Sequence, residues 1–248
     1  MKVTTLLPNI GKDNEITRNI WIEQQLKSLP AGLKILDAGA GECQYKKYCG
    51  HLDYTSQDFA QYDGLGNTAG LQMKKWDNSK IDIISDIIAI PVQAGSFDAI
   101  LCAEVLEHLP DPISALKELS RVLKKNGHLI LTAPFCSLTH FAPYHFSTGF
   151  NKYFYNYHLQ KLGFEVIEME KNGNYYSYLA QEIRRLPEIQ KKYSRLHMSY
   201  FYKMYYYFLS YLFLKILYKF HVNNVKSEEL LTFGYHIHAI KNPKVSIH

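Results

Sequence analysis

Hydrophobic and polar residues follow a pattern that predicts strands and helices in alternation. A helix is expected over 14–29, because apolar residues recur there at helical spacing and Pro30 and Gly32 follow. Short apolar runs predict five strands, over 33–36, 52–57, 81–86, 96–102 and 128–133. Strands that alternate with helices favour an α/β fold with a mainly parallel sheet and right-handed crossovers.

Further helices and strands are expected around and after these runs. Residues 43–49 predict a short helix, and Asp111-Pro112 predicts the start of a longer one that ends at Lys124, Lys125 and Gly127. A helix over 151–162 and a strand over 164–168 follow. Residues 233–241 alternate with period two, which predicts a last strand, antiparallel at the sheet edge.

The segment 174–230 interrupts this pattern as a helical, tyrosine-rich insertion. Its centre, 200–220, is apolar or aromatic nearly all round, which predicts a helix that is buried or lies against a partner or a membrane. Its longest charge-free run, Met204 to Leu214, has 11 residues, against the roughly 20 that span a bilayer. A substrate cap, a homodimer contact and a peripheral membrane contact are the alternatives.

Composition narrows the class of protein. A chain of 248 residues can form one α/β domain with additions, and we expect a single domain over 1–248. Its four cysteines have no zinc-site spacing, so free thiols and no metal site are expected. The N-terminus lacks the apolar stretch of a signal peptide, which favours a cytoplasmic protein. Residues 184–226 contain nine Lys and Arg residues but only one acidic residue, so the positive charge is concentrated in the insertion.

Acidic residues and glycines stand where the first strands end. Asp37, Asp58 and Asp86 each close a predicted strand, and Gly39 and Gly41 form a turn that a ligand can approach closely. An acid at the tip of the second strand can grip a ribose diol, although it can also cap a surface turn. Phe59, beside Asp58, could pack on an adenine ring. The layout predicts a nucleotide-binding crevice.

Four segments give the chain a more specific character. They are LDAGAGE (36–42), YTSQDF (54–59), the stretch SDIIAIPVQAGSFDAILCAEVLEHLPDP (85–112) and LKELSRVLKKNGHLILTAPF (116–135). In this order and spacing they resemble the class I S-adenosylmethionine (SAM)-dependent methyltransferases, and more closely the type 11 group. The resemblance implies a Rossmann-like, seven-stranded, mostly parallel sheet with an antiparallel last strand, helices on both faces and a helical insertion before that strand. The SAM-binding core would occupy 33–170.

The resemblance also implies roles for particular residues. The glycine turn would hold the methionine part of SAM, through Asp37, Ala38, Gly39, Ala40 and Gly41. The next two strand ends would hold the ribose and the adenine, through Asp58, Phe59, Asp86 and Ile87. The stretch after the fourth strand would line the methyl-transfer site, through Ala103, Glu104 and His108.

Methyl transfer from SAM is an in-line displacement, so positioning is the main task, and a base is needed only for a protonated acceptor. His145, His108 and Tyr144 are the candidates for handling the acceptor. The acceptor is expected to be a small molecule or a glycan- or lipid-linked compound, and the cytoplasmic protein could lie at the membrane surface through 200–220.

Three alternatives compete with a small-molecule methyltransferase. A dinucleotide-dependent dehydrogenase would need Gly or Ala where Gln44 stands. A nucleic-acid methyltransferase could use the basic insertion, but the motif that such enzymes carry after the fourth strand is replaced by Ala103-Glu104-Val105. The third alternative is a SAM-binding scaffold without catalysis, which the retained acids do not favour.

Overall fold

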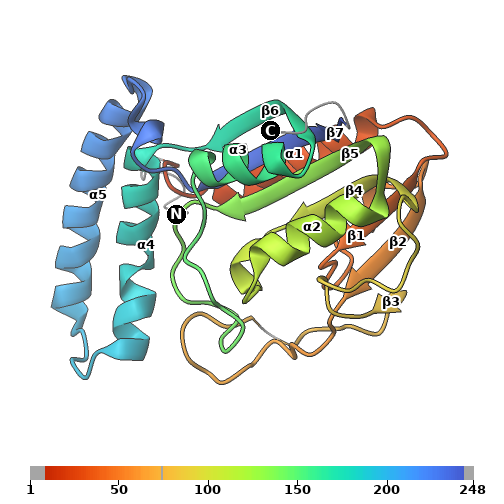
Figure 1. Ribbon diagram of the computed structural model, residues 1–248. Coiled ribbons are helices and arrows are strands. Elements are labelled where there is room, and N and C mark those ends of the chain that lie inside the picture. The colour runs from red at the N-terminus through yellow and green to blue at the C-terminus, as the bar shows by residue number, and fades with distance from the viewer. Residues whose placement is uncertain (1–8, 74, 243–248) are drawn as a thin grey trace. The chain divides into compact units, whose positions relative to one another are not determined.

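A computed structural model describes residues 9–73 and 75–242 (Figure 1). The helices are α1 (Asn14–Ser28), α2 (Pro112–Val122), α3 (Lys152–Lys161), α4 (Tyr175–Tyr193) and α5 (Tyr200–Val222). The strands are β1 (Lys34–Ala38), β2 (Asp53–Asp58), β3 (Ile83–Ile84), β4 (Phe97–Ala103), β5 (Leu123–Pro134), β6 (Phe164–Asn172) and β7 (Gly234–Lys241). Single 3₁₀ turns lie at Lys46–Tyr48, Leu106–His108 and Ser227–Glu229.

The seven strands form one sheet in the order β3-β2-β1-β4-β5-β7-β6. The pairs among β1 to β5 are parallel, and β7 is antiparallel to β5. This arrangement confirms the predicted seven-stranded, mostly parallel sheet with an antiparallel last strand. The edge position predicted for β7 is wrong, because β7 lies between β5 and β6. The alternating sequence suggested an edge strand with one exposed face. In the structure both faces are covered, because the consecutive residues Tyr235, His236 and Ile237 are all buried.

Helices cover both faces of the sheet, because successive strand residues point to opposite sides. Leu36 and Ile100 belong to a core cluster with α2 and α3, whereas their neighbours Ile35 and Leu101 pack with Trp21 of α1. The alternation explains why these strands are apolar at consecutive positions. A strand buried on both faces is typical of parallel sheets.

Several predicted boundaries are wrong for local reasons. The helix expected over 43–49 is only the 3₁₀ turn Lys46–Tyr48. The third strand is only two residues long, Ile83–Ile84. At Asp82 the side chain takes the place of a backbone pairing, because it accepts hydrogen bonds from the backbone amide and the hydroxyl of Ser56. The helix begins at Pro112 as expected, and the Asp111 side chain caps it by accepting the Ser114 amide. It ends at Val122, before the predicted stop, because Leu123 already pairs with Phe97 as the start of β5.

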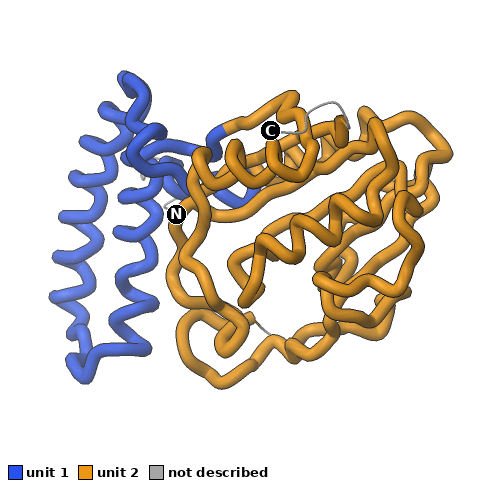
Figure 2. The backbone as a smooth tube through the Cα atoms, viewed as in Figure 1, with its two compact units in different colours: residues 1–17, 171–233 blue, residues 18–170, 234–248 orange. Residues whose placement is uncertain are grey.

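The chain separates into two compact units (Figure 2). One comprises residues 18–170 and 234–248 and contains most of the sheet, and the other comprises residues 1–17 and 171–233. In the second unit α4 and α5 pack side by side through Ala180, Leu214 and Leu217. Of the alternatives for 200–220, burial within the chain is contradicted, because Leu214 and Leu217 are the only fully buried residues of this segment. A contact with a partner or a membrane stays a prediction. Within the described ranges, no helix combines the length and apolarity that a bilayer span requires.

Candidate active site

A cavity of about 470 Å³ lies in the larger unit at the carboxyl ends of β1, β2 and β4. Strand ends at this edge of an open α/β sheet form the ligand crevice. The volume falls within the range of roughly 300–1,000 Å³ that small-molecule sites occupy. Its lining residues are Gly39, Gln57, Asp58, Phe59, Gln61, Tyr62, Trp76, Ile84, Ser85, Asp86, Ile87, Glu104, Val105, His108, Leu109, Pro110, Phe141, Tyr144 and Phe146.

The glycine turn closes one end of this cavity. Gly39 has φ +74°, and its amide donates to the Gln57 carbonyl oxygen at 2.8 Å. A Cβ at position 39 would lie 2.4 Å from a methyl group of Val105, so no other residue fits without movement. Gly41 has φ +51°, and a Cβ there would lie 2.5 Å from the Trp76 ring. Both glycines are therefore required by backbone conformation and by close packing.

Asp58 joins the second strand end to the glycine turn. Its Oδ2 accepts the Gly41 amide at 2.9 Å, and its Oδ1 accepts the Ala60 amide at 2.8 Å. Each carboxylate oxygen has a second lone pair, so Asp58 can still accept from a ribose diol. Asp86 lines the same cavity, and its Oδ1 accepts the Ile88 amide at 3.1 Å. We call Gly39, Asp58 and Asp86 the strand-tip wall.

Asp37 is placed differently from the other two acids. Its carboxyl is buried within β1, where Oδ2 accepts the Tyr54 hydroxyl at 2.6 Å, and it does not line the cavity. Burial raises its pKa to about 7, the Tyr54 hydrogen bond opposes the shift, and the nearby Asp58 charge adds to it. The Asp37 side chain therefore contacts Tyr54 and does not line the cavity in which its cofactor contact was expected. Other expected contacts that do not line the cavity are Ala38, Ala40, Gly41 and Ala103.

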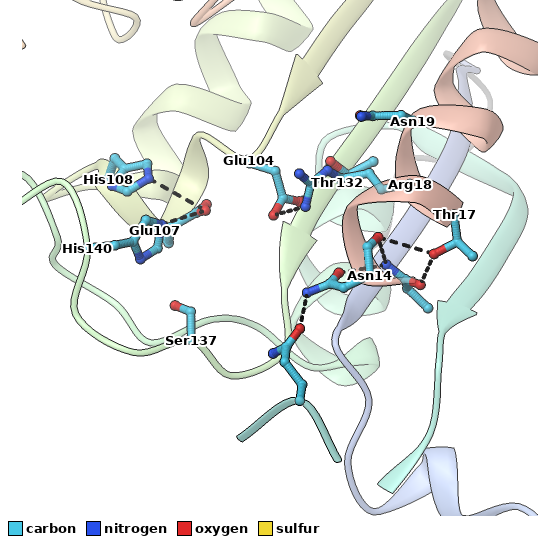
Figure 3. A network of polar contacts seen from close by, with 12 residues as sticks. Asn14, Thr17, Arg18, Asn19, Glu104, Glu107, His108, Thr132, Ser137 and His140 are labelled. Carbon is cyan, nitrogen blue, oxygen red and sulfur yellow. Dashed lines mark hydrogen bonds and ion pairs between the residues drawn. The ribbon is translucent and has the colours of Figure 1, made fainter. Parts of the chain in front are cut away.

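Glu104 lies at the end of β4 with φ +56°. Its Oε2 pairs with Arg18 at 2.9 Å, and its Oε1 accepts the Thr132 hydroxyl at 2.9 Å (Figure 3). The residue lines the cavity as predicted, but its carboxylate is already neutralised by Arg18. This ion pair fixes the floor of the cavity at the point where β4 ends.

A loop after β5 forms the opposite side of the cavity through Phe141, Tyr144 and Phe146, which we call the loop wall. The amides of Phe146 and Ser147 donate to the Glu107 carbonyl oxygen, which holds the loop against the end of β4. Tyr144 packs edge-on against Phe59, with ring centroids 4.9 Å apart. Among the predicted acceptor-handling residues, His108 and Tyr144 line the cavity, whereas His145 does not.

His108 and Glu107 follow β4 within one 3₁₀ turn (Figure 3). The His108 Nδ1 lies 2.6 Å from the Tyr144 carbonyl oxygen. Burial and the neighbouring His140 and His145 rings lower the pKa of His108 to about 3, so its ring is neutral. The Glu107 carboxyl is fully buried, and burial together with the Glu104 charge raises its pKa.

Sequence reasoning named Phe59 and Tyr144 but missed the other aromatic residues of the cavity, which are Tyr62, Trp76, Phe141 and Phe146. Tyr62 and Trp76 come from the polar segment between β2 and β3, which has no periodic pattern. Their rings pack on Phe141, with centroids 4.4 Å and 5.5 Å away. Large aromatic residues in an otherwise polar loop are the one signal that could have indicated them, because such residues are usually buried against something.

Comparison with known proteins shows which class of protein this chain is similar to. Residues 36–131 match the family model described as Methyltransferase domain. Over 105 residues the chain is 32% identical to a ubiquinone biosynthesis O-methyltransferase of Xanthomonas oryzae pv. oryzae, which covers 41% of this chain and 43% of the relative. The chain thus matches less than half the length of this relative. The matched segment, 36–131, lies within the predicted SAM-binding core, and the match agrees with the resemblance drawn from the sequence.

Solved structures agree with the fold. A SAM-dependent methyltransferase from Archaeoglobus fulgidus superimposes with a TM-score of 0.56 at 16% identity, over 92% of this chain and 94% of that one. The [4+2]-cyclase SpnF superimposes with a TM-score of 0.53 at 17% identity, over 91% and 80% of the two chains. At this identity the likeness concerns the fold alone, and a cyclase among the neighbours illustrates that the fold does not fix the reaction.

The residues around the cavity fit the cofactor of this family. Two acids at adjacent strand ends keep open acceptor positions for the polar groups of a nucleoside. Gly39 lines the cavity without a side chain, so its backbone is open to a ligand there. Phe59 and Ile87 supply apolar surface between the acids, where an adenine ring can lie. SAM supplies an activated methyl group when bound, and these residues would hold its nucleoside part.

Proposed function

We propose that the protein is a SAM-dependent methyltransferase that acts on a small-molecule acceptor. The observation that supports this most strongly is the cavity itself, where Gly39, Asp58 and Asp86 converge from three strand ends opposite an aromatic loop. The strand-tip wall binds the donor, and the loop wall shapes the acceptor side. Enclosure by the loop wall also excludes water, which favours transfer to the acceptor.

The cavity residues suit a mechanism based on positioning. Aligning acceptor, methyl group and sulfur in one line provides most of the acceleration for an activated donor. His108 is a poor general base, because a pKa of about 3 means that its ring barely holds a proton near neutral pH. Tyr144 lines the cavity and offers a hydroxyl that can orient an acceptor. His145 remains a candidate that acts from behind the lining.

The acceptor is best described as a compound with a flat apolar body and a nucleophilic group. Tyr62, Phe141 and Phe146 give the cavity aromatic surface suited to such a body. The name of the Xanthomonas relative includes ubiquinone and O-methylation, which supports a hydroxyl of an amphipathic aromatic compound as the first acceptor to test. A glycan-linked acceptor remains the second candidate from the sequence.

Binding and turnover test this proposal separately. Isothermal titration of the full chain with SAM should give one site, and titration with NAD should give none. Incubation with SAM and hydroxylated aromatic acceptors should produce S-adenosylhomocysteine. SAM binding without product for any acceptor class would favour a catalytically inactive scaffold, and product only with RNA or DNA would favour a nucleic-acid methyltransferase. NAD binding without SAM binding would overturn the assignment.

We also propose that α5 contacts the surface of an anionic membrane. The aromatic side chains of α5 are far more exposed to solvent than aromatic residues usually are. The exposed fraction is 74% for Phe201, 61% for Tyr205 and 59% for Phe208. Lys203, Lys215 and Lys219 stand among them and would meet lipid phosphates. Exposed aromatic surface beside cationic residues is typical of peripheral membrane helices.

Vesicle sedimentation tests this contact. The wild-type chain should sediment with phosphatidylglycerol vesicles, and the double variant Phe201→Glu with Phe208→Glu should not. Tyr157→Glu is the matched control, because Tyr157 is also exposed (54%) but lies on α3. Unchanged sedimentation of the double variant would contradict the proposal, and a dimer that the same variant dissociates would assign α5 to a homodimer contact instead.

A further inference from the structure

Three histidines gather behind the cavity, from two loops that are distant in sequence. His108 follows β4, and His140 and His145 lie in the loop after β5. One ring nitrogen of each lies within 4.8 Å of one ring nitrogen of both others. The ring centroid of His140 is 4.7 Å from that of His108 and 4.8 Å from that of His145. The cluster was not apparent from sequence spacing, because at least 31 residues separate its first member from the others.

Backbone carbonyl groups fix the tautomers of two of these rings. The Nδ1 of His108 lies 2.6 Å from the Tyr144 oxygen, and the Nδ1 of His140 lies 2.8 Å from the Leu138 oxygen. A carbonyl oxygen only accepts, so each Nδ1 carries the hydrogen and each Nε2 carries the lone pair. Metal-binding histidines are oriented in this way, with one nitrogen donating to a carbonyl and the other bound to the ion. The two ring nitrogens of His145 are buried and have no hydrogen-bond partner within residues 9–73 and 75–242.

Glu107 adds a carboxylate to the cluster. Its side chain is fully buried, and neither oxygen has a hydrogen-bond partner among the described residues. Its Oε1 lies 3.7 Å from the His108 Nε2 and 3.9 Å from the His140 Nε2 (Figure 3). These distances are too long for hydrogen bonds. They are closer to the separation of two ligands on one tetrahedral ion, about 3.3 Å for bonds of about 2.0 Å.

We propose that His108, His140 and His145 bind one divalent first-row transition-metal ion of the Zn²⁺ class, with the Glu107 carboxylate beside it. Imidazole nitrogens suit Zn²⁺, Co²⁺ or Ni²⁺, whereas Mg²⁺ and Ca²⁺ prefer oxygen ligands. The ion would give the buried Glu107 oxygens a cationic neighbour. It also fastens the loop wall to the end of β4 at His108, which lines the cavity. This site does not depend on the proposed methyltransferase activity.

Metal binding by the full chain tests the proposal directly. Protein stripped with a chelator should bind one Zn²⁺ per chain by calorimetry, and Co²⁺ should give the visible absorption bands of a tetrahedral complex. His140→Ala and His145→Ala should each abolish the bands. His158→Ala is the matched control and should keep them, since His158 lies on α3 outside the cluster. Glu107→Gln should lower the Zn²⁺ affinity by roughly 10–100-fold.

SAM titration of each variant provides the check on folding. A variant that still binds SAM but no longer binds Zn²⁺ supports the site, whereas equal Zn²⁺ binding by wild type and both histidine variants overturns it. Absence of stoichiometric Zn²⁺ and Co²⁺ binding by the folded wild type would overturn it as well. Because SAM binding is measured independently, failure of the metal site can be distinguished from failure of the proposed function.

Discussion

The two sides of the cavity are built in different ways. The strand-tip wall consists of Gly39, Asp58 and Asp86, at or just after strand ends, and backbone hydrogen bonds hold each of them to its own turn or to the neighbouring strand end. The loop wall consists of Phe141, Tyr144 and Phe146, in a loop whose amides donate to the carbonyl oxygens of Glu107 and Leu71. The first wall is built from neighbouring strand ends, and the second depends on contacts between more distant segments. We therefore expect donor binding to follow changes in the first wall and turnover to follow changes in the second.

The largest effect is expected from adding a methyl group at the glycine turn. Gly39→Ala introduces a Cβ 2.4 Å from Val105 at a backbone φ of +74°. The turn must shift to relieve this contact, so SAM affinity should fall by at least about a hundredfold, measured by calorimetry. Gly50→Ala is the control and should bind normally, because nothing lies within 4 Å of its added Cβ. Normal SAM affinity in folded Gly39→Ala protein would mean that the strand-tip wall does not bind the donor.

Removal of the charge at the second strand end should have the next largest effect. Asp58→Asn keeps the shape of the side chain but weakens the hydrogen bonds to the Gly41 and Ala60 amides and any bond to a ribose. Charge-assisted hydrogen bonds are worth about 1.5–3 kcal/mol, so SAM affinity should fall roughly 10–100-fold. Asp53→Asn, at the exposed start of the same strand, is the control. Equal losses in both variants would point to a general charge effect rather than to a specific contact.

The buried Asp37 should make folding stability fall as pH rises. Its folded pKa of about 7 lies above the ordinary 3.8, so the folded protein retains a proton that the unfolded chain has already released. The stabilisation is complete below pH 3.8 and is lost as pH rises through about 7. Between about pH 5 and 6.5 the free energy of unfolding should fall by about 2 kcal/mol. Denaturant titrations should show a flatter profile for Asp37→Asn, and an unchanged profile would show that Asp37 ionises normally.

The smallest effect is expected behind the loop wall. His145→Ala should lower turnover about tenfold, which corresponds to about 1.4 kcal/mol, because the ring supports the loop that carries Tyr144. SAM affinity should stay within about twofold of wild type, since the donor side is untouched. Steady-state kinetics and calorimetry on the same preparation measure both quantities. Unchanged turnover would exclude a role for His145, and a parallel loss of SAM affinity would show that the two walls are not independent.

The sequence indicated the donor side of the site well. A glycine turn after a buried strand, and acids at the next two strand ends, are local features that survive folding with little alteration. The prediction for Asp37 shows where this reasoning stops. An acid at the end of a strand can point into the crevice or into the sheet, and only the packing of Tyr54 decides which. Four aromatic cavity residues, Tyr62, Trp76, Phe141 and Phe146, were missed for the same reason, since their partners come from distant loops.

Residue type and order along the chain determined the alternating strands and helices and the glycine turn, because each follows from backbone preferences over a few residues. Tertiary structure alone decided that β7 enters the sheet beside β5, that α5 exposes its aromatic residues, and that three histidines meet Glu107. These features depend on which distant segments come together. Whether one side chain buries another cannot be seen in the sequence pattern around either residue.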